Sequence, residues 1–151
     1  MENEQIIITA LTQTSPEVED AIKKLAQKIG DNYKELTSDD LSEMISSPNI
    51  TLLVAKNGET IVGMITVVVY RIPYVKKAYL DDLVVDETHR GLGIAKQLMT
   101  YAMNLAKEKG AAYVDLTARP RRAEGNSLYE TLGFKKRDTN VYRLVFDYGE
   151  V

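Results

Sequence analysis

Glycines and cations gather at the start of an apolar, helix-like run. Gly91 and Gly93 follow Arg90, and Lys96 lies in the first turn of a run that begins at Ile94. Glycine costs backbone entropy, so spending two of 9 glycines here needs a reason. About four N–H groups at a helix start lack intrahelical acceptors and carry partial positive charge, and glycines leave them accessible. The pattern therefore indicates a site for the diphosphate of a nucleotide.

Two other interpretations of this stretch stay open. The glycines could serve turn geometry alone. Alternatively, Gly91 and Gly93 supply the first two glycines of the dinucleotide pattern G-x-G-x-x-G. The third position of that pattern is Lys96, and the residues DETHR separate the preceding strand from Gly91, whereas the dinucleotide turn is tight. The dinucleotide interpretation is therefore disfavoured.

Composition limits the possible classes of function. The chain has 151 residues, 44% hydrophobic and 27% charged, so we expect a single domain over residues 1–151. The net charge of −3 argues against a nucleic-acid partner, although basic residues gather in 119–122 and 135–137. The absence of cysteine excludes thiolate catalysis. Without an apolar run of spanning length or a basic leader, we expect a cytoplasmic protein with no membrane partner.

Hydrophobic periodicity and turn residues predict a mixed α/β domain in the order β-α-α-β-β-β-α-β-α-β-β. A hairpin over residues 51–70 is expected to turn at Asn57-Gly58 with type I′ geometry. A crossover from strand 78–85 through a long helix to strand 112–118 makes those two strands parallel. The other expected elements are a strand at 5–13, helices at Pro16–Gly30, Asp39 or Asp40–Ser46 and 122–134, a loop at 71–77, and a last hairpin of 135–137 with 141–146.

Three features in the right order resemble the GNAT superfamily of acyl-CoA-dependent N-acetyltransferases. YLDDLVVDETHRGLGIAKQLM is similar to the acetyl-CoA motif, whose core is Arg or Gln, two residues, Gly, one residue, then Gly or Ala. Arg90, Gly93 and Ala95 fill those places. GNSLYETLGF is similar to a second block, with Asn126 and Tyr129 in their usual positions. The order of helices and strands is also that of the family.

The resemblance covers about residues 50–146 and implies acetyl-CoA as co-substrate, with no metal. It implies a mostly antiparallel sheet whose central parallel pair, strands 78–85 and 112–118, splays to hold the acyl-CoA. Backbone groups of one strand would pair with the pantetheine arm, and the helix start would hold the diphosphate. The implied cofactor-binding residues are Leu83, Val84, Val85, Arg90, Gly91, Leu92, Gly93, Ile94, Ala95, Lys96, Asn126 and Tyr129. Asn126 is alternatively a polar residue of a first helical turn.

The implied reaction is direct attack of a primary amine on the thioester in a ternary complex. Deprotonating an alkyl ammonium at pH 7 costs roughly 4.6 kcal/mol, so a general base helps. Strand alternation predicts that Asp81 and Asp82 point to opposite faces, with Asp81 on the face of Leu83 and Val85. The resemblance favours Asp81 as catalytic residue, either as base or as the group that orients a cationic amine; Asp82 or a water chain are alternatives. Tyr129 is the implied acid that protonates the departing thiolate.

The acceptor is left open among small amines, amino acids, antibiotics and protein amines. His89 lies at the phosphate end, several residues from the expected thioester, and is interpreted as a solvated or phosphate-side residue. An acyl-CoA-binding regulatory module with little turnover is the alternative function, and the resemblance leaves room for a homodimer. The residues expected to line the acceptor site are Tyr33, Tyr70, Arg71, Tyr74 and Tyr142.

Overall fold

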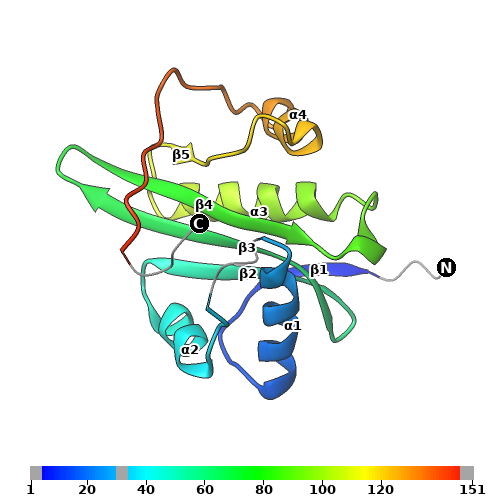
Figure 1. Cartoon of the computed structure of the whole chain (residues 1–151). Coiled ribbons are helices and arrows are strands. Elements are labelled where there is room, and N and C mark those ends of the chain that lie inside the picture. Colours follow the sequence, from blue (N-terminus) through cyan, green and yellow to red (C-terminus); the bar gives the residue numbers. More distant parts are fainter. Residues whose placement is uncertain (1–4, 30–33, 147–151) are drawn as a thin grey trace.

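A computed structural model describes residues 5–29 and 34–146 as a five-stranded sheet with helices on both faces (Figure 1). The strand order is β1-β2-β3-β4-β5, with parallel pairing between β4 and β5 and antiparallel pairing elsewhere. The predicted mixed, mostly antiparallel class is confirmed. The elements are β1 (Ile6–Ala10), α1 (Pro16–Gln27), α2 (Ser38–Ser46), β2 (Ile50–Asn57), β3 (Thr60–Ile72), β4 (Val75–Val85), a 3-10 turn (Glu87–His89), α3 (Ile94–Glu108), β5 (Val114–Asp115) and α4 (Ala123–Thr131).

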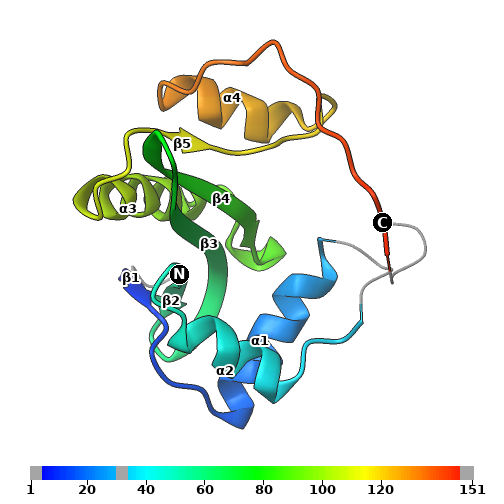
Figure 2. The same ribbon diagram turned by 90° about the vertical axis from the view of Figure 1, so that its left-hand side faces the viewer.

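The helices form two layers around the sheet (Figure 2). Helix α3 packs on one face, where Leu98 and Met99 join a buried cluster with strand residues such as Ile65. Helices α1 and α2 pack on the other face through Ile22 and Leu41. Helix α4 lies beyond α3, on the β5 side of the sheet. In the described part of the chain, no helix combines the length and apolar character needed to cross a membrane.

The first two helices begin at side chains that satisfy their terminal N–H groups. Ser15 accepts a hydrogen bond from the backbone of Val18, and Pro16 occupies the first helical position, as predicted. Thr37 and Asp40 form a reciprocal capping box at α2. The predicted end of α1 at Gly30 lies outside the described residues. Helix α3 has no such side-chain cap at its start.

Two turns differ from the predicted geometry. The hairpin of β2 and β3 is confirmed, but a positive φ occurs at Gly58 and not at Asn57. One positive φ at the first central residue is typical of a type II′ turn, so the type I′ prediction was wrong. The loop predicted over 71–77 is a tight turn at Pro73 and Tyr74, because β3 and β4 extend to pair Ile72 with Val75.

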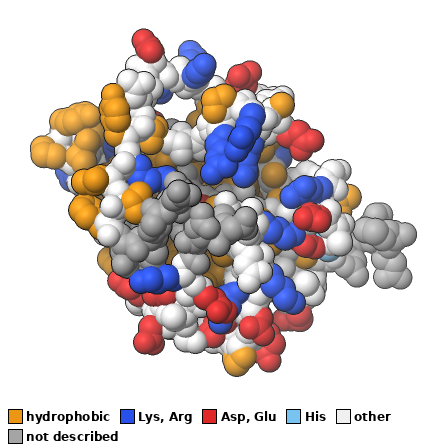
Figure 3. Space-filling model, viewed as in Figure 1, with side chains coloured by type: hydrophobic (Ala, Val, Ile, Leu, Met, Phe, Trp, Pro, Cys, Tyr) orange, Lys and Arg blue, Asp and Glu red, His pale blue; other side chains and the backbone are white. Residues whose placement is uncertain are grey.

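The predicted last hairpin of residues 135–137 and 141–146 is not formed, and β5 has only 2 residues. In Figure 2 the chain after α4 runs well apart from β5. A strand needs a partner for its backbone, and β5 offers too short a ladder for residues 141–146. The parallel pair therefore lies at the sheet edge and not at its centre. Tyr142 is 86% exposed and Phe146 91% exposed, and Figure 3 shows hydrophobic side chains on this side of the molecule.

The core under α3 predicts a large cost for one deletion. Leu98 is fully buried, so Leu98→Ala should lower the free energy of unfolding by roughly 2–5 kcal/mol. Thr100→Ala, at an exposed position of the same helix, should change it by less than about 0.5 kcal/mol. Urea denaturation followed by circular dichroism measures both. Equal losses in the two variants would contradict this packing.

Candidate functional site

The start of α3 differs from the starts of α1 and α2. Its N-cap residue, Gly93, provides no side-chain acceptor, and its first turn contains no acidic residue. Helices α1 and α2 each have a side-chain acceptor at the N-cap and acidic residues in the first turn. The N–H groups of residues 91–96 donate to no acceptor within the described part of the chain. The positive end of α3 is therefore free to receive an anion from outside the protein.

The two glycines at this helix start are required by backbone conformation. Gly91 and Gly93 both have φ of +79°, a region that other residues rarely adopt. A Cβ atom at either position would meet no atom within 4 Å, so the space above these amides is open. The glycines therefore permit the loop's path and also leave its N–H groups accessible. Arg90 and Lys96 flank them with exposed side chains.

A gap opens beside the second half of β4. Strands β4 and β5 pair only where Ala78 meets Val114 and Tyr79 meets Asp115, while β4 continues to Val85. The described residues supply no strand partner for Leu80–Val85 on that side. The parallel pair is thus present but short, and it lies at the edge of the sheet; its splay stays a prediction.

The register decides which backbone groups face this gap. The N–H of Asp86 donates to the carbonyl oxygen of Val62 on β3, at 2.8 Å. Alternation along an antiparallel strand then directs the N–H and C=O of Val85 into the gap and those of Val84 toward Met64 on β3. Val85 is placed to pair with an extended ligand. Val84, expected to do the same, is engaged in the sheet.

A β-bulge changes the direction of the β4 side chains. Ile65 on β3 lies opposite both Asp82 and Leu83, because the pairing runs from Val84 with Met64 to Asp81 with Thr66. Asp82 has φ of +56°, the left-handed region that Asp tolerates better than most residues.

The bulge determines which face of the sheet Asp81 points to. Leu80 belongs to the core under α3, and Leu83 and Val85 pack against that same core, whereas Val84 belongs to the cluster under α1 and α2. Asp81 follows Leu80 and points to the opposite face from it. The expectation that Asp81 shares a face with Leu83 and Val85 was therefore wrong, because one inserted residue resets the alternation.

Both aspartates have exposed surface, yet nearby protein atoms reduce their hydration. Burial raises the pKa of Asp81 above the usual value. Burial, and then the charge of Asp81, raises the pKa of Asp82. Each carboxylate is therefore a stronger base than an isolated one. They lie where β4 borders the gap.

Tyr129 lies on α4 and packs against the core under α3. Its ring contacts the ring of Phe134 edge to face, with centroids 6.1 Å apart, and packs against the same core as Leu83 and Val85. Burial raises the pKa of Tyr129, with the charge of Arg122 opposing this in part. Its hydroxyl makes no hydrogen bond within the described residues. Tyr129 and the end of β4 thus pack against one extended core, and the Tyr129 hydroxyl is free to donate.

Asn126 supports the loop before α4. Its Nδ2 donates to the carbonyl oxygens of Arg119 at 2.9 Å and Arg122 at 2.8 Å. These bonds use the donors that would otherwise contact a cofactor arm. The structure therefore favours the alternative interpretation of Asn126 as a polar residue of the first turn of α4.

His89 is not solvated. Its side chain is 18% exposed, and its ring nitrogens contact Asn57 Nδ2 at 3.1 Å and Thr88 Oγ1 at 2.9 Å. Asn57 lies on β2, far along the chain, so no spacing pattern could have revealed this contact. The phosphate-side interpretation agrees with its position in the turn before Arg90.

The expected acceptor residues do not form one cluster. Tyr33 lies outside the described residues, and Tyr142 is highly exposed. Tyr74 is also highly exposed, but its side chain hydrogen-bonds Tyr113. Tyr70 lies beside Lys77, whose Nζ is 5.6 Å from the ring centroid.

Lys77 was not identified from the sequence. Its Nζ also lies 5.7 Å from the Tyr113 ring centroid and 3.7 Å from Asp115 Oδ2. A lysine inside a strand carries no motif signal, so this cluster emerges only from the pairing of β3, β4 and β5. It occupies the edge of the sheet where the parallel pair meets.

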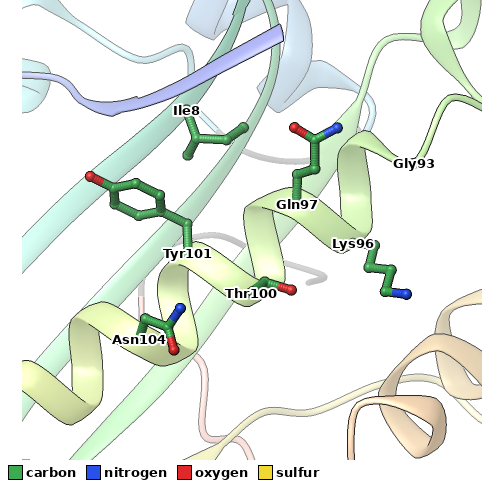
Figure 4. A pocket seen from close by; sticks show the side chains of 7 residues that line it. All are labelled: Ile8, Gly93, Lys96, Gln97, Thr100, Tyr101 and Asn104. Carbon is green, nitrogen blue, oxygen red and sulfur yellow. The ribbon is translucent and has the colours of Figure 1, made fainter.

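A separate groove of about 380 Å³ lies between β1 and α3 (Figure 4). Gly93 and Lys96 contribute to one end of it, but neither Asp81 nor Tyr129 lines it. In Figure 4, Lys96 points away from Ile8 on β1. Basic side chains gather near α4 on the face shown in Figure 3. Among the described residues, no group of three or more His, Cys, Asp or Glu side chains is arranged to hold a metal ion.

Comparison with known proteins places this arrangement among acetyltransferases. The model of the acetyltransferase (GNAT) family matches residues 18–134. N-acetyltransferase 8 of Homo sapiens is 31% identical over 125 residues, which is 78% of this chain and 55% of that protein. The chain thus spans about half the length of the curated relatives it matches.

Two solved structures share the architecture. A protein from Bacillus halodurans C-125, described as a transcriptional regulator, is 29% identical, has a TM-score of 0.75 and is matched over 93% of this chain and 100% of its own. An aminoglycoside acetyltransferase from an uncultured soil metagenomic sample, in complex with trehalose, has a TM-score of 0.81 at 22% identity, covering 93% of this chain and 97% of that one. The second similarity establishes the fold alone.

The conformation of the helix start predicts opposite effects of two glycine substitutions. Gly93→Ala forces a side chain into positive φ and should lower the free energy of unfolding by roughly 1–2 kcal/mol. Gly125→Ala, inside α4 and at ordinary distance from the Tyr129 ring, should raise it by roughly 0.5–1 kcal/mol. Urea titrations measure both changes. A neutral or stabilising Gly93→Ala would show that the loop adopts another conformation.

Proposed function

Since the chain belongs to the acetyltransferase (GNAT) family, we propose that it transfers an acetyl group from acetyl-CoA to a primary amine by direct attack in a ternary complex. The observation that carries this proposal is the set of unpaired N–H groups of residues 91–96. They would bind the diphosphate of the coenzyme, with Arg90 and Lys96 as cationic partners. We propose that residues 1–151 act as one such domain.

The gap beside β4 would hold the pantetheine arm. Its amides are an extended chain of donors and acceptors, which can pair with an open strand edge as an added strand does. Val85 presents its backbone groups there, and Leu83, in the bulge, contributes to the same wall. The thioester would then lie near the bulge, between Asp81 and Tyr129.

Tyr129 would act as general acid. The departing thiolate has a conjugate thiol pKa near 8.5, below that of a phenol, so proton donation must occur as the bond breaks and the charge develops. Burial raises the pKa of Tyr129, so the phenol is protonated at neutral pH and is a weaker acid than an exposed tyrosine. Its hydroxyl has no competing partner in the described chain.

Asp81 would attract the ammonium form of the acceptor and take up its proton, directly or through water. Burial raises the pKa of Asp81, which brings it closer to the pKa of an amine and makes the carboxylate a stronger base. Asp82 adds negative charge beside it. The acids favour a cationic acceptor, which is the class we propose, whether a small amine or an amine of a protein.

A second candidate is an acyl-CoA-binding module that regulates other proteins. It is favoured by the 29% identical Bacillus halodurans structure, which is described as a transcriptional regulator. Both candidates use the same coenzyme site, so turnover separates them.

Tyr129→Phe should lower kcat by roughly 100-fold while the acetyl-CoA KM stays within about two-fold, because only proton donation is lost. Release of free thiol is the measurement, made with a panel of polyamines, aminoglycosides, amino acids and peptides. Tyr101→Phe, exposed on α3, is the matched control and should match the wild type. An unchanged slow rate in Tyr129→Phe, with coenzyme still bound, would favour the regulatory module.

The pH dependence should report the charge of Asp81. Its carboxylate is ionised above its raised pKa, so kcat/KM should rise as pH increases through that value. Asp81→Asn should remove this acidic limb and lower kcat/KM roughly 10- to 100-fold, whereas Asp82→Asn should leave the limb in place, because burial is the cause of the raised pKa of Asp81. The profile is measured from about pH 4 to pH 8, around the ordinary Asp range. A limb that persists in Asp81→Asn would assign the charge to another group.

A further inference from the structure

A polar network fixes the turn that precedes the open amides. The 3-10 turn Glu87–His89 leads directly into residues 90–93, and His89 joins it to the end of β2 through Asn57, with Nε2 3.1 Å from Nδ2. On the other side Asp86 bonds Lys28 of α1 at 3.1 Å and, through its N–H, the Val62 carbonyl oxygen of β3. Helix α1 and strands β2 and β3 therefore all bond to this one short turn.

The hydrogen-bond partners of His89 indicate which ring nitrogen donates and which accepts. The Thr88 hydroxyl has a single hydrogen and donates it to Asp86 Oδ2. The hydroxyl oxygen can then only accept from His89 Nδ1, 2.9 Å away, so Nδ1 carries a proton. With the Asn57 amide oriented as in the structure, its Nδ2 donates to the lone pair of His89 Nε2. His89 thus bridges two elements as donor and acceptor at once.

Nothing else in the described residues orients the Asn57 amide. Its Oδ1 is buried and has no hydrogen-bond partner. A half-satisfied buried amide is costly and is retained where its remaining bond matters. That remaining bond is the one to His89.

The charges around His89 hold this arrangement in place. Asp86 Oδ2 lies 3.6 Å from Nδ1, and its hydrogen bonds with Thr88 and Lys28 lower the pKa of Asp86 to about 2. Lys28 also lies 3.9 Å from Glu87. The turn is therefore anchored by an ionised Asp86 at neutral pH.

We propose that His89 is a positioning residue for the coenzyme, which fixes the loop of open amides by accepting a hydrogen bond from Asn57. The inference rests on the proposed function, because it assumes that residues 91–96 bind the diphosphate. Loss of the bond frees the turn, and the amides must then be ordered when the coenzyme binds. The affinity for coenzyme A falls while the chemistry at Tyr129 is untouched.

Two substitutions of His89 separate its two nitrogens. His89→Gln places an amide oxygen near the Nε2 position and keeps an acceptor for Asn57, whereas His89→Asn keeps only the Thr88 side. His89→Asn and Asn57→Ala should each raise the Kd for coenzyme A and the KM for acetyl-CoA roughly five-fold, the effect of one lost hydrogen bond. Their kcat should stay within about two-fold of the wild type, and His89→Gln should retain most of the affinity. Calorimetry gives Kd, and thermal unfolding confirms that each variant is folded.

The double variant Asn57→Ala with His89→Asn should be no weaker than either single variant, because both remove one bond. Additive losses, a His89→Gln as weak as His89→Asn, or folded variants with wild-type Kd would each overturn the role of His89. Those results leave the proposed function intact when the wild type binds coenzyme A. Absence of saturable binding to the wild type would overturn the proposed function and this inference together.

Discussion

Unpaired backbone donors at the start of α3 are the constraint around which the site is built. Ile94 and Leu98 are buried in the core, so the first turns of the helix are fixed even though its terminal amides have no partner among the described residues. In α1 and α2, the side chains of Ser15 and Thr37 accept hydrogen bonds from terminal amides, and acidic residues occupy the first turn. Here a rigid core holds an uncompensated positive end at the surface, which is a stable arrangement when an anion completes it.

Strand β4 positions the rest of the site next to that helix start. Its bulge at Asp82 and Leu83 turns Asp81 to one face and Leu83 to the other, so acid and core contact come from neighbouring residues. Its end at Val85 borders the gap left by the short β5. The turn after it carries His89 and delivers the chain to Gly91 and Gly93. One strand thus sets the wall, the acid and the approach to the open amides.

The parts of the fold that follow from local pattern could be predicted. The apolar stripe of α3, the cap of α1 at Ser15 and the paired glycines each express a short-range requirement, and the structure agrees with all of them. The parts that depend on distant partners could not. Residues 141–146 have a strand-like pattern, but a strand forms only where another strand offers its backbone, and β5 is too short to do so.

The errors within the site have the same origin. An inserted residue in β4 leaves no sign in the sequence, so the face of Asp81 was assigned wrongly. Asn57 was assigned to a turn that Gly58 makes, and its side chain instead bonds His89 from another part of the chain. Asn126 matched a family position, yet its donors support the loop before α4. In each case type and position were visible, and the partner was not.

The central claim is that the amides of residues 91–96 bind the diphosphate of coenzyme A, and nuclear magnetic resonance tests it residue by residue. Uniformly ¹⁵N-labelled protein is titrated with coenzyme A while backbone amide resonances are followed. The account predicts saturable shifts that are largest for residues 91–96, with smaller ones at Val85. Saturable shifts confined to the groove between β1 and α3, around Thr100 and Asn104, or no saturable shift at all, would contradict it.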